Sequence, residues 1–265
     1  MYMDECRLPL LRHRIFSVSA FRPEALVEAV RAERGMEAAP VPAVCVLDFD
    51  GDLTDWLVRT GIARPHPAWA CFHTTMVSFP VDGMEFGMIA RTIGGPYAVL
   101  VAEQMHVSGV QVLLGFTSAG RVDPALPVPS LVVATGAIRD EGTSYHYLPA
   151  GERVAAPGVL ADRLYRGLQG LGLPVSQGML WTTDAPYRET LEELREHAEA
   201  GALAVEMQAA SLFAFAEAKQ ATVGMVAHVT NAIDHSGEPF DKGCDAHGWH
   251  LVQAMCRVGR ELLRG

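Results

Sequence analysis

The segment from Ala204 to His235 constrains the fold of this 265-residue chain more than any other. A short apolar run ends in Glu206-Met207-Gln208, a stretch rich in small residues follows, and a second apolar run ends in Thr230-Asn231. The two apolar runs predict buried strands, and the stretch between them predicts a helix. In an open α/β sheet, ligands bind at the carboxyl ends of the strands. We therefore expect the polar residues that end the two runs to face one crevice.

The same alternation of strands and helices recurs along the chain and predicts a layered α/β domain with a mixed or parallel central sheet. We expect one domain over residues 1–265, in which residues 1–20 form a surface or subunit-contact segment. Predicted strands cover Ala43–Phe49, Ala70–Phe79, Glu85–Ala90, Val110–Phe116, Leu131–Thr135, Gly178–Trp181, Leu203–Glu206 and Val223–Val229. Predicted helices cover residues 23–35, 97–106, 160–171, 189–200, 209–219 and 246–263.

Charge and cysteine content exclude several classes of function. A net charge of -10 argues against a nucleic-acid surface, because neutralising backbone phosphates needs clustered Lys and Arg. A small anion needs only a few local donors and stays compatible with this charge. The five cysteines are scattered without a C-x-x-C pair, so we expect reduced thiols and no metal site. No apolar run approaches the roughly 20 residues that span a membrane, so the expected location is the cytoplasm.

Four short motifs in register give the chain a family resemblance. They are Gly94-Gly95-Pro96, Arg139 to Tyr147 (RDEGTSYHY), Thr183-Asp184 and Val205-Glu206-Met207. With these motifs the chain resembles the nucleoside phosphorylase family, which includes uridine phosphorylase, purine nucleoside phosphorylase and methylthioadenosine nucleosidase. The likeness covers roughly residues 40–265, and the loop that carries RDEGTSYHY is most similar to uridine-phosphorylase-like members.

The resemblance implies a three-layer α/β/α sandwich whose mixed sheet curls into a barrel-like form. It also implies a homo-oligomer, either a dimer or a hexamer built from dimers. The family cleaves the bond between a base and C1′ of ribose, with inorganic phosphate as co-substrate and without a cofactor. As the bond lengthens, the sugar becomes oxocarbenium-like and the base gains negative charge, so the protein mainly positions and stabilises charges.

For the phosphate, the resemblance implies Gly51 in a glycine loop after the first strand, and Thr117 and Ser118 after a later strand. The arginine that phosphorylases carry after the first glycine is missing here, and residues 52–55 read Asp-Leu-Thr-Asp. The later loop also lacks its arginine. Arg91 is suited to bidentate phosphate binding and is the candidate replacement, while pairing with one of the many acidic residues is an equally open reading.

For the sugar, Glu206, Met207 and Gln208 match the family's E-M-E motif except at its last position. Gln208 keeps an acceptor for the ribose hydroxyls but loses the carboxylate charge. The alternative reading is that Met207 belongs to the core and Gln208 caps a helix. His13 is the candidate for the N-terminal histidine that, in this family, reaches the 5′ end of the sugar in a neighbouring subunit.

For the base, Tyr147 lies where uridine-phosphorylase-like enzymes place an aromatic ring, although it is equally compatible with packing inside its own loop. Arg188 is suited to donate to a base oxygen and stabilise the leaving anion; the alternative is a solvent-exposed residue in a first helical turn. Asn231 cannot act as an acid but can donate to a 6-oxo or pyrimidine carbonyl oxygen, which argues against adenine.

Three functions stay open from the sequence. The first is a nucleoside phosphorylase that uses a nucleoside and phosphate, with Arg91, Arg188 and Asn231 as catalytic residues. The second is a nucleosidase that uses water, because the usual phosphate arginines are absent. The third is a non-catalytic nucleoside-binding protein. Asp234-His235 and the histidines of residues 245–250 suggest a metal cluster only weakly, and we prefer to interpret the latter as a helix start.

Overall fold

The computed structural model describes residues 8–232 and 245–264. The strands are β1 (Val44–Asp48), β2 (Arg64–Pro65), β3 (Met76–Val81), β4 (Met84–Ala90), β5 (Val112–Arg121), β6 (Ser130–Asp140), β7 (Arg153–Ala155), β8 (Val175–Thr183), β9 (Ala202–Glu206) and β10 (Thr222–Ala232). The α-helices are α1 (Pro23–Arg34), α2 (Asp52–Arg59), α3 (Gly95–Val107), α4 (Leu160–Leu168), α5 (Leu191–Glu199), α6 (Ala209–Lys219) and α7 (Asp245–Leu262). Short 3₁₀ helices are η1 (Pro9–Leu11), η2 (Thr143–His146) and η3 (Pro186–Arg188).

All of these strands belong to one mixed sheet, and five of them form a closed ring. The strand order is β10-β6-β8-β9-β5-β1-β4-β3-β2, and β7 pairs with β6. Because β10 also pairs with β5, the strands β5, β10, β6, β8 and β9 form a closed ring. The remaining strands extend from β5 as an open sheet, in which β1 lies parallel to both β4 and β5. The predicted mixed, barrel-like sheet is therefore confirmed.

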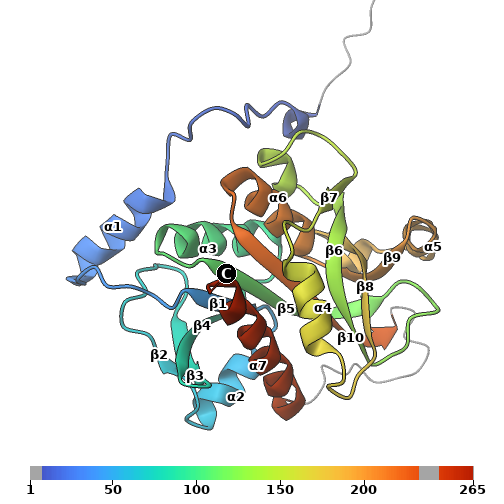
Figure 1. Cartoon of the computed structure of the whole chain (residues 1–265). Coiled ribbons are helices and arrows are strands. Elements are labelled where there is room, and N and C mark those ends of the chain that lie inside the picture. The colour runs from blue at the N-terminus through green and yellow to red at the C-terminus, as the bar shows by residue number, and fades with distance from the viewer. Residues whose placement is uncertain (1–7, 233–244, 265) are drawn as a thin grey trace, which may run out of the picture.

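Helices cover both faces of the sheet and give the predicted three layers (Figure 1). One core packs under α3 and α6, and a second packs under α2, α4 and α7. Strand β1 shows how one strand serves both cores: Cys45 and Leu47 belong to the first, and Val44 and Val46 to the second. A strand that packs on both faces favours apolar residues, which explains why β1 is hydrophobic up to its last residue, Asp48.

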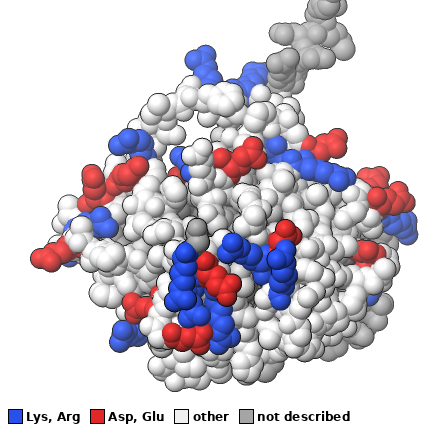
Figure 2. Space-filling view, in the orientation of Figure 1, with Lys and Arg blue, Asp and Glu red and all other residues white. Residues whose placement is uncertain are grey.

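Helix α7 is held at its surface by a small group of charges. Arg257 donates from Nε to Asp82 Oδ2 at 2.9 Å, and Arg260 lies 3.5 Å from the same oxygen. Asp82 is in the tight turn between β3 and β4, with φ of 47°. Beside these residues, a groove between α4 and α7 is lined by Arg163, Arg166 and Glu261, and basic and acidic side chains gather there at the centre of Figure 2.

Several predicted boundaries were wrong. The strand predicted at Ala70–Phe79 begins only at Met76, because side-chain bonds hold the preceding residues in a turn: Trp69 Nε1 donates to Thr74 Oγ1 at 2.9 Å. Helix α2 was not predicted at all, and neither were β2 and β7. The loop predicted from Gly136 to Pro149 begins as strand, since β6 continues to Asp140 in parallel pairing with β8.

The chain before α1 lies along the outside of the molecule. Residues 8–20 are mostly exposed, and η1 contacts η2. Helix α1 packs through Val27 and Val30 against Ala70. Within residues 8–232 and 245–264, no helix has the length and apolar character needed to cross a membrane.

Candidate functional site

The carboxyl ends of three neighbouring strands bring the predicted anion-binding residues together. Asp48, the last residue of β1, pairs with Ala90 of β4 and with Phe116 of β5. Arg91 therefore follows directly on one side of Asp48, and Ser118 lies two residues further along on the other. The expectation that strand ends gather these side chains matches the geometry of parallel strands.

Gly51 and Arg91 are in direct contact. Gly51 has φ of 83°, a left-handed conformation that side-chain-bearing residues rarely adopt. A Cβ atom at Gly51 would lie 2.6 Å from Arg91 Cγ and 3.0 Å from Arg91 Cζ. Arg91 itself has φ of 59°, and its backbone N–H donates to the carbonyl of Asp48 at 2.9 Å. The glycine is thus required both by its own turn and by the guanidinium that crosses it.

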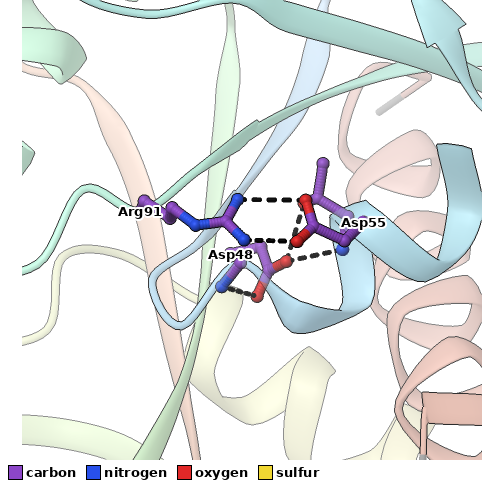
Figure 3. Close-up of polar contacts among 5 residues, drawn as sticks. Asp48, Asp55 and Arg91 are labelled. Carbon is purple, nitrogen blue, oxygen red and sulfur yellow. Dashed lines mark hydrogen bonds and ion pairs between the residues drawn. The ribbon is translucent and has the colours of Figure 1, made fainter.

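The guanidinium of Arg91 faces the carboxylate of Asp55 in a two-pronged ion pair (Figure 3). Arg91 Nη1 donates to Asp55 Oδ1 at 3.0 Å, and Nη2 donates to Oδ2. Hydrogen bonding from Arg91 lowers the pKa of Asp55 below its usual value. Both side chains stay about half exposed, at 54 % and 52 %. Of the two readings of Arg91, pairing with an acidic residue is the one seen in this structure.

Asp48 is buried and organises the start of α2. Its Oδ2 accepts hydrogen bonds from Thr54 N at 2.8 Å and from Thr54 Oγ1 at 2.7 Å, and its Oδ1 accepts from Gly51 N at 3.2 Å. Burial raises the pKa of Asp48, and these hydrogen bonds oppose the rise. An acceptor at the first turn of a helix satisfies N–H groups that have no partner within the helix. This contact explains why residues 52–55 form a helix.

Ser118 is also bonded to an aspartate. Its backbone N–H donates to Asp50 Oδ2 at 2.8 Å, and its hydroxyl donates to Asp50 Oδ1 at 2.9 Å. The neighbouring Thr117 is buried, and its hydroxyl donates to the carbonyl of Ser118 at 2.8 Å. Both residues lie within β5 and not after it as predicted, because pairing with β10 and β9 extends this strand to Arg121.

Glu206 and Gln208 lie at the junction of β9 and α6. Glu206 is buried; its Oε2 accepts from the backbone N–H groups of Gln208 and Ala209 at 2.6 and 2.8 Å, and its Oε1 accepts from Thr182 Oγ1 at 2.5 Å. Burial raises the pKa of Glu206 to about 7. Gln208 is the residue before α6, but its side chain makes no capping bond and instead accepts from Met207 N at 3.2 Å.

The pairing of β5 with β9 brings the predicted phosphate-binding residue Ser118 close to the predicted sugar-binding residue Met207. Gly120 pairs with Val205 in antiparallel register. Ser118 and Met207 are each only two residues from this pair, so the two predicted sites meet at one place on the sheet. These sites, predicted separately from sequence, therefore belong to one region of the molecule.

A third set of contacts attaches the loop after β6 to the same region. Glu141 is buried and accepts from Ser211 Oγ of α6 at 2.5 Å, as well as from Ser144 N. Gly142 N donates to Asp184 Oδ2 at 2.8 Å, which ties the loop to the end of β8. Gly95 of the Gly-Gly-Pro motif packs against Ser211, where a Cβ atom would collide with the hydroxyl.

The predicted base-binding residues have different surroundings. Tyr147 is half-buried, packs edge-on against Phe215 of α6, and donates to Glu103 Oε1 of α3 at 3.0 Å. Burial raises the pKa of Tyr147 further above its usual value. Asn231 is buried near the end of β10 and is paired in register with Gly120 of β5. Arg188 lies in η3 and is exposed.

The histidines noted in the sequence lie in different parts of the molecule. The ring of His13 lies 3.7 Å from the ring of His146, centroid to centroid, in the same chain and next to Tyr147. Of the residues that weakly suggested a metal cluster, 234 and 235 lie outside the described part of the chain. Helix α7 begins at Asp245, in agreement with the preferred interpretation of residues 245–250 as a helix start. Among the described residues, no group of three or more His, Cys, Asp or Glu is arranged to hold a metal ion.

A cleft of about 620 Å³ opens beside Arg91. Its polar lining includes Arg91, Asp55, His73, Thr74 and Tyr97. Tyr97 donates from its hydroxyl to the carbonyl of His73 at 3.1 Å. The ion pair of Arg91 and Asp55 is thus part of the wall of a cleft that is large enough for a small ligand.

Comparison with known families gives a match to the phosphorylase superfamily over residues 55–264. The chain belongs to this superfamily. Its match includes Arg91, Ser118 and residues 206–208, and it begins four residues after Gly51. Within the superfamily fold, the site thus lies where strand ends, the start of α6 and the loop after β6 meet.

Similar proteins with curated names include two kinds of phosphorylase. A guanosine phosphorylase of Halorubrum lacusprofundi is 30% identical over 175 residues, which cover 64% of this chain and 70% of that protein. A uridine phosphorylase of Klebsiella aerogenes is 24% identical over 197 residues, which cover 69% and 78%. A uridine phosphorylase of Thermococcus kodakarensis is 25% identical over 177 residues, covering 59% and 63%.

The sequence did not reveal that acidic residues pair with other residues of the candidate site. Asp50 and Asp55 bind the candidate anion residues, and Glu141 joins the loop after β6 to α6. The signal for the first two was the run Asp50-Gly51-Asp52 at a strand end followed by Asp55. Which donors these carboxylates accept from depends on strand pairing, and therefore a local pattern does not reveal it.

Proposed function

We propose that this chain is a uridine-phosphorylase-like nucleoside phosphorylase, a pentosyltransferase that releases a free base and ribose 1-phosphate. Superfamily membership and relatives named guanosine and uridine phosphorylase support the proposal. The observation that carries it is the grouping of Gly51 and Arg91, which follow β1 and β4, with Ser118 of the neighbouring β5, two residues from the pairing of β5 with β9.

In the proposed reaction, a phosphate oxygen forms a bond to C1′ while the bond from C1′ to the base nitrogen breaks. The electron pair of the broken bond goes to the base, which then takes up a proton. Arg91 and Ser118 hold the phosphate, with Gly51 and Thr117 shaping its site, and Glu206, Met207 and Gln208 hold the sugar. Charge-assisted hydrogen bonds to a phosphate are stronger than neutral ones, which suits Arg91 to this role.

Tyr147, Arg188 and Asn231 are the proposed base-binding residues. The amide of Asn231 donates to a carbonyl oxygen of a 6-oxopurine or a pyrimidine, but it cannot act as the acid that protonates a departing adenine. Substrates with a carbonyl at the recognised edge are therefore proposed, which suits both guanosine and uridine. His13 is proposed to approach the 5′ end of the sugar.

The test is incubation of the purified chain with uridine, guanosine, inosine and 5′-methylthioadenosine, with and without inorganic phosphate. Chromatography of free base and of ribose 1-phosphate measures the products. We expect phosphate-dependent release from uridine or guanosine and a strong rise in KM for phosphate in Arg91→Ala. Gln208→Ala should chiefly raise KM for the nucleoside. Release of ribose in place of ribose 1-phosphate would contradict phosphorolysis.

A nucleosidase that uses water is the second candidate. The observation in its favour is that Asp50 and Asp55 accept hydrogen bonds from Ser118 and Arg91, the donors that a phosphate would use. Equal rates with and without phosphate support this candidate. Nucleoside binding without base release at any phosphate concentration supports instead the non-catalytic binding protein.

A further inference from the structure

Three of the four predicted phosphate-binding residues already have an aspartate as their partner, while the fourth, Thr117, donates to the carbonyl of Ser118. Arg91 donates to Asp55, Ser118 donates to Asp50 through both its N–H and its hydroxyl, and Gly51 N–H donates to Asp48. Three carboxylates thus occupy places that an anion would take. Carboxylate and phosphate oxygens accept from the same donors, so the two compete.

The three carboxylates differ in how easily a ligand can displace them. Asp48 is only 2 % exposed and supports the start of α2, so it is part of the fold. Asp55 is 52 % exposed and lies on the first turn of α2, where its side chain can rotate toward solvent without movement of the backbone. Asp50 is half-buried and contacts Ser118 alone among the bonds described for it.

We propose that Asp50 and Asp55 hold the phosphate donors of the ligand-free chain, that phosphate binds by displacing them, and that these two carboxylates set the affinity for phosphate. The inference rests on the proposed phosphate site. Exposed ion pairs contribute little to stability, so opening the pair of Arg91 with Asp55 costs little. The displaced carboxylates stay within a few ångströms of the dianion and repel it.

The cleft beside Arg91 gives the ligand a route to the pair of Arg91 with Asp55. Asp55 and Arg91 both line it, so a phosphate that enters meets the ion pair directly. Arg91 keeps its place during the exchange, because its backbone N–H is bonded to the carbonyl of Asp48 and its side chain lies across Gly51. Only the carboxylate side of the pair has to move.

The test is calorimetric titration of inorganic phosphate into the nucleoside-free protein. The variants are Asp55→Asn and Asp50→Asn, which keep the shape of the side chain and remove its charge. Asp162→Asn is the matched control: Asp162 is an exposed residue of α4 bonded to Gln177 on another part of the surface. Thermal unfolding of each variant confirms that it folds.

We expect Asp55→Asn to bind phosphate about tenfold more tightly than the unmodified chain, with a smaller gain in Asp50→Asn. In steady-state kinetics, KM for phosphate should fall while KM for the nucleoside stays unchanged. Asp162→Asn should match the unmodified chain in both measurements. Unchanged or weaker phosphate binding in both folded variants would overturn the inference.

The binding measurement separates this inference from the proposed function. If no nucleoside is cleaved but the two variants bind phosphate more tightly, the proposed function fails and the role of the carboxylates stands. If phosphate-dependent cleavage occurs but the variants bind phosphate no better, the function stands and the role of the carboxylates fails.

Discussion

Gly51 meets two structural requirements, a left-handed backbone conformation and close contact with Arg91. Its φ of 83° favours glycine, and its missing side chain leaves room for Arg91. The sequence predicted a glycine that allows close approach of a ligand after the first strand. In the structure, the group that makes the close approach is a side chain of the same chain. The backbone conformation of Gly51 and the room that it leaves for Arg91 are therefore two separate reasons for glycine at this position.

The substitution Gly51→Ala tests both requirements against a matched control. We expect it to lower the free energy of unfolding by about 1–3 kcal/mol, because it adds a strained backbone conformation and a collision with Arg91. Gly61→Ala is the control, since Gly61 has φ of 75° and open space where its Cβ would lie. Chemical denaturation measures both variants. Equal losses in the two would mean that contact with Arg91 is not what requires glycine at position 51.

At the scale of elements, Glu206 joins the end of β9 to the start of α6. Its carboxylate accepts two backbone N–H groups at the beginning of α6, and Thr182 of β8 donates to it as well. The sequence motif identified Glu206 as part of a sugar site. The structure adds that this carboxylate is used to align two strands and a helix, and Met207 and Gln208 are positioned by that alignment.

The ionisation of Glu206 gives a prediction of pH dependence. Burial raises its pKa from 4.5 to about 7, so the folded chain binds this proton more strongly than the unfolded chain. The stabilisation that comes from protonated Glu206 is fully present below about pH 4.5 and is lost as the pH rises to about 7. We expect the free energy of unfolding, relative to Glu206→Gln, to fall by about 1–3 kcal/mol across this range.

Denaturation curves of both proteins between pH 4.5 and pH 8 measure this difference. The comparison with Glu206→Gln removes the contributions of other groups whose pKa burial raises, such as Asp48 and Asp184. A difference that rises with pH, or stays flat, would show that the three hydrogen bonds keep Glu206 ionised in the folded chain.

At the scale of the whole molecule, the closed ring of five strands and the flanking helices determine where the site lies. The ring forms because β10 pairs with both β5 and β6. Helix α7 returns the end of the chain to the β3–β4 turn, where Arg257 and Arg260 meet Asp82. This contact joins segments about 175 residues apart in sequence.

The substitution Asp82→Asn tests how much this long-range contact contributes. Because Asp82 and Arg257 are exposed, we expect only a small loss in the free energy of unfolding. Asn also tolerates the positive φ at this position, so backbone strain should not change. Denaturation at low and high salt measures the effect, which should shrink as salt screens the charges. A large loss that does not depend on salt would show that α7 depends on this contact for docking.

The sequence by itself determined the layered α/β fold and the order of most strands and helices. Apolar runs that are buried on both faces, such as residues 44–47 of β1 and 223–227 of β10, can be recognised locally because none of their residues has a polar side chain. Family motifs also named Gly51, Ser118 and residues 206–208 before their positions were known. These features depend on residues that are adjacent in the chain.

Only the tertiary structure decided the partners of the charged side chains. Helix α2 was missed because its start depends on Asp48, which precedes it and is held in place by neighbouring strands. Arg91 binds Asp55 and Asp50 binds Ser118 across 36 and 68 residues of sequence, respectively. Hydrogen bonds and ion pairs depend on distances of a few ångströms, and strand pairing sets those distances.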